Sequence, residues 1–222
     1  MLDFLSEYDV LGAFWVNVQL TIYAAIGSLI WGTILVAMRA SPVPIMRAFG
    51  TGYVNIVRNT PLTVIIVAAS LGLGQTMGIT LGGGTFDSIG FRLALLGFIA
   101  YTATFVCESL RAGINTVPVG QAEAARALGL GFTQVLGIIV LPQAFRSVIA
   151  PLASVLIALT KNTTVAAAIG VGEAALLMRE MIENESDALF LVTAMFALGF
   201  VILTLPTGLL LGWVAKKVAV KR

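Results

Sequence analysis

Two polar segments interrupt stretches of the sequence that are otherwise apolar. Arg58-Asn59-Thr60-Pro61 (the RNTP segment) stands within residues 53–73, and Lys161-Asn162-Thr163-Thr164 (the KNTT segment) stands within residues 148–171. Pro61 has no amide hydrogen and its ring clashes with the carbonyl group four residues earlier, so a helix must break there. The freed backbone groups and the Thr hydroxyls can bind a polar ligand in apolar surroundings.

A third polar position inside an apolar stretch is Glu108, three residues before Arg111. This spacing places both side chains on one helix face, where they can form an ion pair. Structural roles compete with ligand binding at all three places. Arg58 and Arg111 can extend to the lipid headgroups, and the Thr hydroxyls of the KNTT segment can hydrogen-bond to a neighbouring helix.

Between residues 112 and 146 the sequence contains the pattern of a short helix, QAEAARALGLG. Ala and Leu favour a helix, Pro118 limits it upstream, and Gly129 or Gly131 can supply a left-handed C-cap. The pattern predicts a helix that docks on a partner or lies on the headgroups. Its apolar stripe, about one turn wide, consists of Ala124, Ala125 and Leu128.

The composition indicates whether these segments lie in water or in a lipid membrane. Of the 222 residues, 11% are charged and 59% are hydrophobic, and the mean hydropathy is +1.00. Soluble domains are about 25% charged, so this chain has too few charges to cover a surface in water. Five stretches, some of them interrupted, reach the length of about 20 residues that a spanning helix needs, namely 14–38, 53–73, 89–110, 148–171 and 188–214. We expect an all-α membrane protein in which residues 1–222 form one transmembrane domain.

Basic residues concentrate in alternate connections between the expected spans. Residues 39–58, residues 111–146 and the tail from Lys216 to Arg222 hold ten of the 13 Lys and Arg residues. Cytoplasmic connections are enriched in such residues. We therefore expect residues 112–146 and the C-terminus to be cytoplasmic and the N-terminus to be external. Nine of the 11 acids then lie outside the cell, including Asp3, Asp87 and Glu173.

Several chemistries are excluded by counting. The chain has no His and one Cys, Cys107, which excludes a disulfide framework, a zinc cluster and a Ser-His or Cys-His pair. No G-x-x-x-x-G-K-[ST] sequence occurs, so we expect neither nucleotide hydrolysis nor a metal or other cofactor in this chain. The basic residues form no stripe, which disfavours nucleic-acid binding.

Spacing in the short-helix region resembles a known motif. Glu123-Ala124-Ala125, three residues, Gly129, nine residues, Ile139, one residue and Leu141-Pro142 match the EAA loop of permease subunits of ABC importers. The flanking sequences VPVGQAEAARALGLG and VLPQAFRSVIAPL are similar to those of the polar amino acid uptake family. The ExxRAGI stretch from Glu108, the RNTP segment and the KNTT segment with its following IGV resemble further segments of that family.

The resemblance implies a type I ABC importer permease in a bacterial cell (inner) membrane. Its EAA loop would form a coupling helix in a cleft of a separate ATPase, through Glu123, Ala124, Ala125, Gly129, Ile139, Leu141 and Pro142. Implied partners are two cytoplasmic ATPase subunits that bind ATP and Mg, a second permease chain, identical or different, and an external substrate-binding protein. We assign nine residues to the substrate path: Arg58, Asn59, Thr60, Pro61, Glu108, Lys161, Asn162, Thr163 and Thr164.

Charge along this path favours one class of amino acid. Where the family often has Asp, this chain has Asn162, so the path with Lys161 and Arg58 is neutral to positive. We expect glutamate or a related acidic or neutral amino acid, unless the binding protein alone selects the substrate. The rival function is an ion- or proton-coupled carrier, which needs carboxylates within the membrane and usually a repeated architecture. Glu108 is the only acid inside an expected span, and no repeat is visible.

Overall fold

The computed structural model describes residues 7–82, 84–131 and 134–218. Asp3, Lys221 and Arg222, which contribute to the expected orientation, lie outside these residues. The described part is built of helices without a β-strand. Within it, four helices are long and apolar enough to cross a membrane, and a bent pair of shorter helices is a candidate fifth span.

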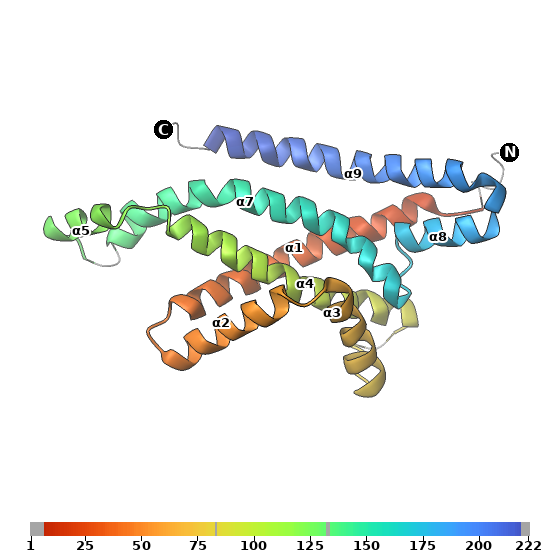
Figure 1. The fold of residues 1–222 in the computed structure, drawn as a ribbon, viewed down its shortest axis with the longest axis horizontal. Helices are drawn as coiled ribbons and strands as arrows, with labels where there is room; N and C mark the ends of the chain where they lie inside the picture. Colours follow the sequence, from red (N-terminus) through yellow and green to blue (C-terminus); the bar gives the residue numbers. More distant parts are fainter. Residues whose placement is uncertain (1–6, 83, 132–133, 219–222) are drawn as a thin grey trace.

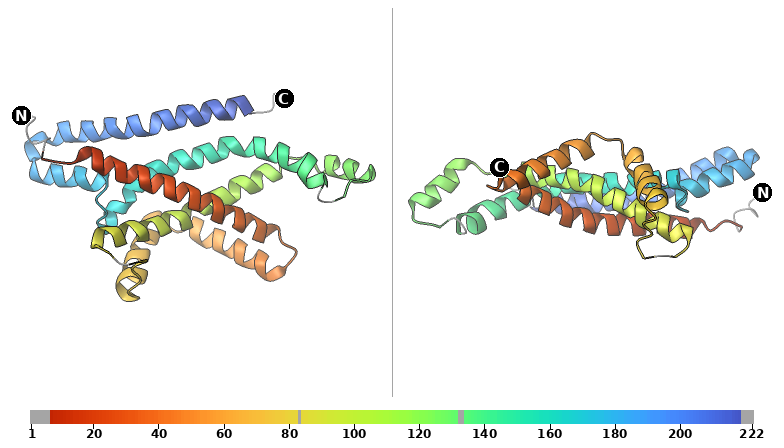
Figure 2. Two further views of the ribbon diagram at one scale, coloured as in Figure 1. Left: turned by 180° about the vertical axis from the view of Figure 1, so that it is seen from behind. Right: turned by 90° about the horizontal axis from the view of Figure 1, so that it is seen from below.

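Two long helices, α1 (Val10–Ala40) and α4 (Phe86–Ile114), run side by side in the same direction through the centre of the molecule (Figures 1 and 2). Glycine allows their close approach, as small residues do between membrane helices. A Cβ atom added to Gly32 would lie 2.9 Å from the carbonyl oxygen of Ala103 and 2.6 Å from a methyl group of Val106. The main core is formed where these helices meet α3 and α7, around Leu20, Ile66, Phe98 and Leu159.

The expected second span is divided in two. α2 (Pro44–Arg58) returns along α1, and α3 (Leu62–Ala68), extended by the π-helix η2 (Ala69–Thr76), leaves it at an angle of 105°. The break falls at the RNTP segment, as expected, and Pro61 is the N-cap of α3. The interruption expected within 53–73 is confirmed, because Pro61 cannot continue the hydrogen bonds of α2.

The chain returns through a second composite helix. The π-helix η3 (Val135–Val140) leads into α7 (Leu141–Asn162), which continues as the 3₁₀-helix η4 (Thr163–Ile169). Pro142 occupies the first turn of α7, where a missing amide hydrogen costs no helical bond. This helical segment therefore begins inside the expected connection 112–146. Between α4 and η3 the chain forms α5 (Val119–Ala127).

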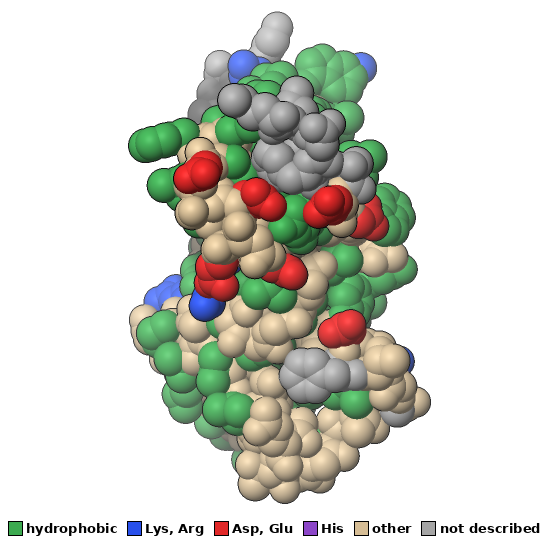
Figure 3. Space-filling model, turned by 90° about the vertical axis from the view of Figure 1, so that its right-hand side faces the viewer, with side chains coloured by type: hydrophobic (Ala, Val, Ile, Leu, Met, Phe, Trp, Pro, Cys, Tyr) green, Lys and Arg blue, Asp and Glu red, His purple; other side chains and the backbone are tan. Residues whose placement is uncertain are grey.

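Two short helices, α5 and α8 (Ala174–Asn184), lie at opposite ends of the long axis (Figure 1). α5 projects from one end, whereas α8 and the start of α1 form the other (Figures 1 and 2). After η5 (Ser186–Ala188), α9 (Leu189–Val218) runs back toward the α5 end. Acidic side chains gather on the α8 end (Figure 3).

Candidate functional site

The backbone of α5 is closed by a glycine cap. The helix begins after Pro118 and ends at Ala127, and Gly129 has a positive φ of 89°. The amide of Gly129 donates to the carbonyl of Arg126 at 2.9 Å, and the amide of Leu130 donates to that of Ala125 at 3.1 Å. This pair of bonds is a Schellman motif. Of the two glycines expected as possible caps, Gly129 takes this position.

Only part of the predicted apolar stripe of α5 is available to a partner. Ala125 is buried as α5 packs on η3, whereas Leu128 is 84% exposed and Ala124 is also exposed. Gln143 of α7 donates to Gln121 of α5 at 2.7 Å, which further fixes α5 on its own chain. One side of α5 is therefore used for packing within the chain, and docking of the rest on a partner stays a prediction.

The other residues of the EAA spacing lie around this contact. Glu123 and Pro142 are exposed, and Ile139 in η3 is half-buried. Leu141 begins α7, and its side chain lies outside the described residues. Most of α5 outside Ala125 is exposed, including Val119, Glu123 and Ala124, and so is the C-cap Leu128.

Glu108 forms a different ion pair from the one expected. Its carboxylate is hydrogen-bonded to the guanidinium of Arg39 on α1, and Arg58 of α2 approaches to 3.9 Å. The Arg39 side chain is 9% exposed, compared with 40% for Arg58. The predicted pair with Arg111 is wrong because the parallel packing of α1 and α4 brings Arg39 alongside Glu108, while Arg111 is exposed.

In the RNTP segment the polar side chains close the end of α2. Asn59 donates to the carbonyl oxygen of Asn55 at 2.7 Å, and Thr60 donates to that of Ile56 at 2.9 Å. Arg58 alone reaches out of the segment, to Glu108. The following helix, α3, packs against η4, which brings the chain after the RNTP segment next to the end of the KNTT segment.

The four residues of the KNTT segment differ in their surroundings. Asn162 is half-buried and lines a cavity of about 340 Å³ between α4 and α7, with Tyr101, Phe105 and Ser154. Lys161 is exposed. Thr163 is fully buried and accepts a hydrogen bond from another helix, so the structural alternative considered for the Thr hydroxyls applies to it. Thr164 donates to the carbonyl of Lys161.

The partner of Thr163 belongs to a buried network that sequence reasoning missed. Asn17 of α1 donates to the Thr163 hydroxyl at 2.9 Å and to the Glu173 carboxylate at 2.8 Å, and all three side chains are fully buried. Glu173, expected among the external acids, is therefore not part of an acidic surface. The available signal was Asn17 itself, a polar residue in the apolar stretch 14–38.

Glu173 is the N-cap of α8 and lies outside the candidate spans. Its carboxylate accepts from the amides of Ala175 at 2.9 Å and Leu176 at 3.1 Å. Burial raises the pKa of this carboxyl group, whereas the hydrogen bonds from Ala175, Asn17 and Leu176 lower it, and the balance is a raised pKa.

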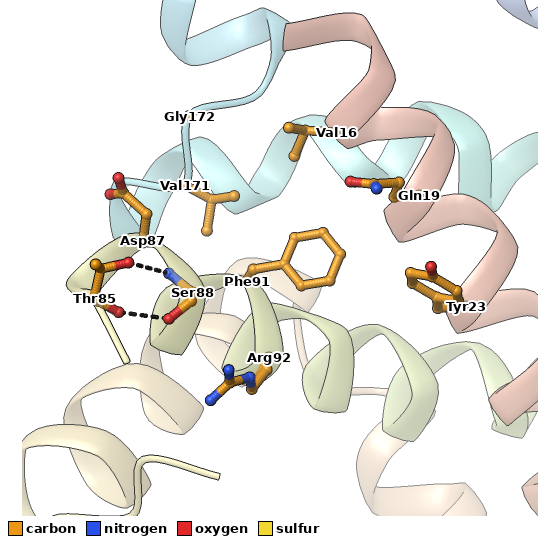
Figure 4. A pocket seen from close by; sticks show the side chains of 10 residues that line it. All are labelled: Val16, Gln19, Tyr23, Thr85, Asp87, Ser88, Phe91, Arg92, Val171 and Gly172. Carbon is orange, nitrogen blue, oxygen red and sulfur yellow. Dashed lines mark hydrogen bonds between the residues drawn. The ribbon is translucent and has the colours of Figure 1, made fainter. Parts of the chain in front are cut away.

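A cavity of about 530 Å³ lies beside this network, between α1, the start of α4 and the linker before α8 (Figure 4). Phe91 and Val171 face it from one side and Tyr23 from the other. Arg92 turns to the preceding loop, where it donates to the carbonyls of Thr80 and Leu81 at 3.3 and 3.1 Å. Its guanidinium therefore supports the loop. In the described part of the chain no three His, Cys, Asp or Glu side chains gather as metal ligands.

Residues 13–220 match the family of binding-protein-dependent transport system inner membrane components. The chain belongs to this family. Within it, the glutamate transport system permease protein GluC of Corynebacterium efficiens is 60% identical over 218 residues, which cover 96% of each chain. The protein of the same name from Corynebacterium glutamicum is 58% identical over the same coverage.

Solved structures agree with the family assignment at the level of the fold. The crystal structure of an amino acid ABC transporter with histidines contains a chain that superposes with a TM-score of 0.81, at 24% sequence identity, over 98% of this chain and 99% of that one. As a member of the family, the chain is a permease subunit of an ABC importer in the inner membrane, and the ATPase of such a system is a separate subunit. The alternative of an ion-coupled carrier is not supported.

Proposed function

We propose that this permease subunit carries glutamate, or a closely related amino acid, into the cell. The observation that carries the proposal is the 60% and 58% identity, over 96% of the chain, to two permeases named for glutamate transport. A permease of this kind works with two cytoplasmic ATPases that bind ATP and Mg, a second permease chain and an external substrate-binding protein.

The α5 end is cytoplasmic and the α8 end is external in this proposal. Lys216 and Lys217 stand in the last turn of α9, which runs toward the α5 end. Glu180 and Glu183 stand exposed on α8 at the opposite end, where acidic side chains gather (Figure 3). This distribution agrees with the enrichment of basic residues in cytoplasmic segments.

The EAA loop couples the permease to its ATPase through the exposed side of α5. Glu123, Ala124 and Leu128 belong to the exposed surface that enters a groove on the ATPase. The Gly129 cap and the bond between Gln121 and Gln143 hold α5 on η3 and α7. A displacement of α5 is therefore passed to α7, which ends at the KNTT segment.

The charges beside the path favour an acidic amino acid. Arg39 already compensates the carboxylate of Glu108, and Arg58 beside them remains 40% exposed. Arg58 and the exposed Lys161 are thus left over as positive charges for a substrate carboxylate. Asn162 and the Thr hydroxyls supply neutral donors and acceptors for the remaining polar groups.

In the transport cycle, the loaded binding protein docks at the α8 end and ATP binding closes the two ATPases. Closure moves the coupling helices and opens the path outward, and hydrolysis resets it. The test is uptake by the complete importer in vesicles. Glutamate uptake should require ATP and persist with an ionophore present. A clear preference for arginine over glutamate would contradict the proposed substrate.

A further inference from the structure

The covalent connection between the KNTT segment and α8 is short and contains two glycines. It consists of Gly170-Val171-Gly172, between the end of η4 and the buried N-cap Glu173. Gly170 has φ of 78°, which a residue with a side chain rarely adopts, and a Cβ atom at Gly172 would meet nothing within 4 Å. Between the glycines, Val171 is 3% exposed and packs in the main core, so the linker is anchored at its centre.

A set of side-chain bonds spans this linker. The amide nitrogen of Asn17 donates to Thr163 at the start of η4 and to Glu173 before α8. Its amide oxygen accepts from the backbone amide of Ala174 at 3.0 Å. One side chain of α1 therefore holds both ends of the glycine linker.

The network is buried and complete. Asn17, Thr163 and Glu173 are each fully buried. Both donor hydrogens and the acceptor of the Asn17 amide are used, and the Thr163 hydroxyl donates its own hydrogen to the carbonyl of Thr160 at 2.8 Å. Buried polar groups with all partners in place favour one geometry, since any shift leaves a group unsatisfied. α8, η4 and the outer part of α1 are thus linked as one unit.

Each end of this unit faces a different functional region. α8 also packs on α9 and presents exposed Arg179, Glu180 and Glu183 at the acidic end of the molecule. Thr163 directly follows Asn162, which lines the cavity between α4 and α7. A force applied to α8 therefore reaches the cavity wall through Glu173, Asn17 and Thr163.

We propose that Asn17 and Glu173 are positioning residues that act through Thr163, and that they transmit the docking of the binding protein on α8 to the KNTT segment. This inference rests on the proposed function, because it requires an external binding protein. It assigns a role to a buried acid and a buried amide that the coupling loop and the substrate path do not use.

The experiment compares variants of the complete importer in vesicles. Asn17→Asp places two carboxylates against each other, and Glu173→Gln replaces one of the two accepting oxygens by a donor, so the bonds from Asn17, Ala175 and Leu176 cannot all be kept. The double variant, Asn17→Asp with Glu173→Gln, restores a donor opposite an acceptor. The matched control is Thr104→Val, since Thr104 is fully buried but bonds only to the carbonyl of Tyr101 in its own helix.

Basal ATP hydrolysis and its stimulation by the loaded binding protein are measured for each variant. The single variants should keep basal hydrolysis, and the maximum stimulation should fall about tenfold, within the usual range of coupling between sites. The concentration of binding protein that gives half of the effect should change less than about twofold, because the docking surface itself is intact. The double variant should recover most of the stimulation, and the control should resemble the wild type.

A second readout follows η4, the helix that continues the KNTT segment. Ala168 in η4 is exposed, so Ala168→Cys offers a thiol for labelling, and mass analysis of the peptide distinguishes it from the buried Cys107. Addition of binding protein and ATP should change the labelling rate in the otherwise wild-type importer and leave it unchanged in Glu173→Gln.

Two results would overturn the inference. One is full stimulation and an unaltered labelling response in both single variants. The other is a parallel loss of assembly, basal hydrolysis and stimulation without recovery in the double variant, which indicates a purely structural network. Absence of glutamate uptake by the wild-type importer would instead count against the proposed substrate, because the comparison of variants depends only on a binding protein that docks.

Discussion

Arg39 and Glu108, 69 residues apart in the sequence, form a direct ion pair between the parallel helices α1 and α4. Replacement of Arg39 by Ala leaves the Glu108 carboxylate with Arg58 at 3.9 Å as its nearest charge partner. Because Arg39 is nearly buried and Glu108 is partly exposed, we expect a loss of about 1–3 kcal/mol in the free energy of unfolding.

Thermal unfolding of the purified permease in detergent measures this loss as a lower Tm. Arg111→Ala is the matched control, since Arg111 is on the same helix as Glu108 but exposed. It should change the Tm little. Equal destabilisation by both replacements would contradict the assignment of Arg39 as the partner.

The glycine cap of α5 provides a test of the coupling helix. In Gly129→Ala the backbone must keep a φ of 89°, at a cost of about 1–2 kcal/mol for a residue with a side chain. We expect assembly in the membrane to be kept and stimulated ATP hydrolysis to fall roughly fivefold or more, because α5 loses its fixed end. Gly120→Ala in the same helix is the control, because its Cβ atom would meet nothing within 4 Å. A similar loss in both variants would argue against the cap.

Close packing of α1 on α4 depends on Gly32. A methyl group there would overlap Val106 and approach the carbonyl oxygen of Ala103, neither of which can withdraw without moving the helices. We expect Gly32→Ala to lower the free energy of unfolding by about 1–3 kcal/mol. In Gly52→Ala, on the open side of α2, no neighbour lies within 4 Å, and the Tm should be unchanged or slightly higher. An equal Tm for the two variants would show that this contact is not tight.

Substrate preference should respond to charge beside the cavity. Asn162→Asp places a negative charge in the wall between α4 and α7. Repulsion of about 1–2 kcal/mol between partly buried charges corresponds to a roughly tenfold lower uptake of glutamate. Asn115→Asp adds the same charge at the exposed end of α4 and should leave uptake intact. Unchanged glutamate uptake in Asn162→Asp would remove this residue from the substrate path.

The buried carboxyl group of Glu173 predicts a dependence of stability on pH. Its pKa is raised in the folded protein, chiefly by burial. It therefore binds a proton more tightly when folded, and its contribution to stability is full below the unfolded pKa and is lost as the pH rises through the folded pKa. From pH about 8 down to about 4, near the ordinary pKa of Glu, the Tm of the wild type should rise relative to that of Glu173→Gln. If the Tm of the wild type and the Tm of Glu173→Gln changed with pH in parallel, the burial of Glu173 would have no effect on its titration.

Local chemistry decided much of what the sequence could predict. Pro61 breaks a helix wherever it stands, and Gly129 caps one, because both effects depend on the backbone of a few neighbouring residues. The helical architecture follows from apolar stretches long enough to span a lipid bilayer. The EAA spacing likewise lies within twenty residues, from Glu123 to Pro142, and it led to the family that the comparisons establish.

Partners of the buried polar groups were decided only by the tertiary structure. From spacing alone, Glu108 had a plausible partner three residues away, yet it pairs with Arg39 on another helix. From its place in the sequence, Glu173 was expected among the external acids. In the structure its carboxylate is buried and accepts a hydrogen bond from Asn17, 156 residues away. A helix period identifies which face of one helix is apolar, whereas a buried ion pair or hydrogen bond depends on which helices meet and at what height, and that is set by the packing of the whole chain.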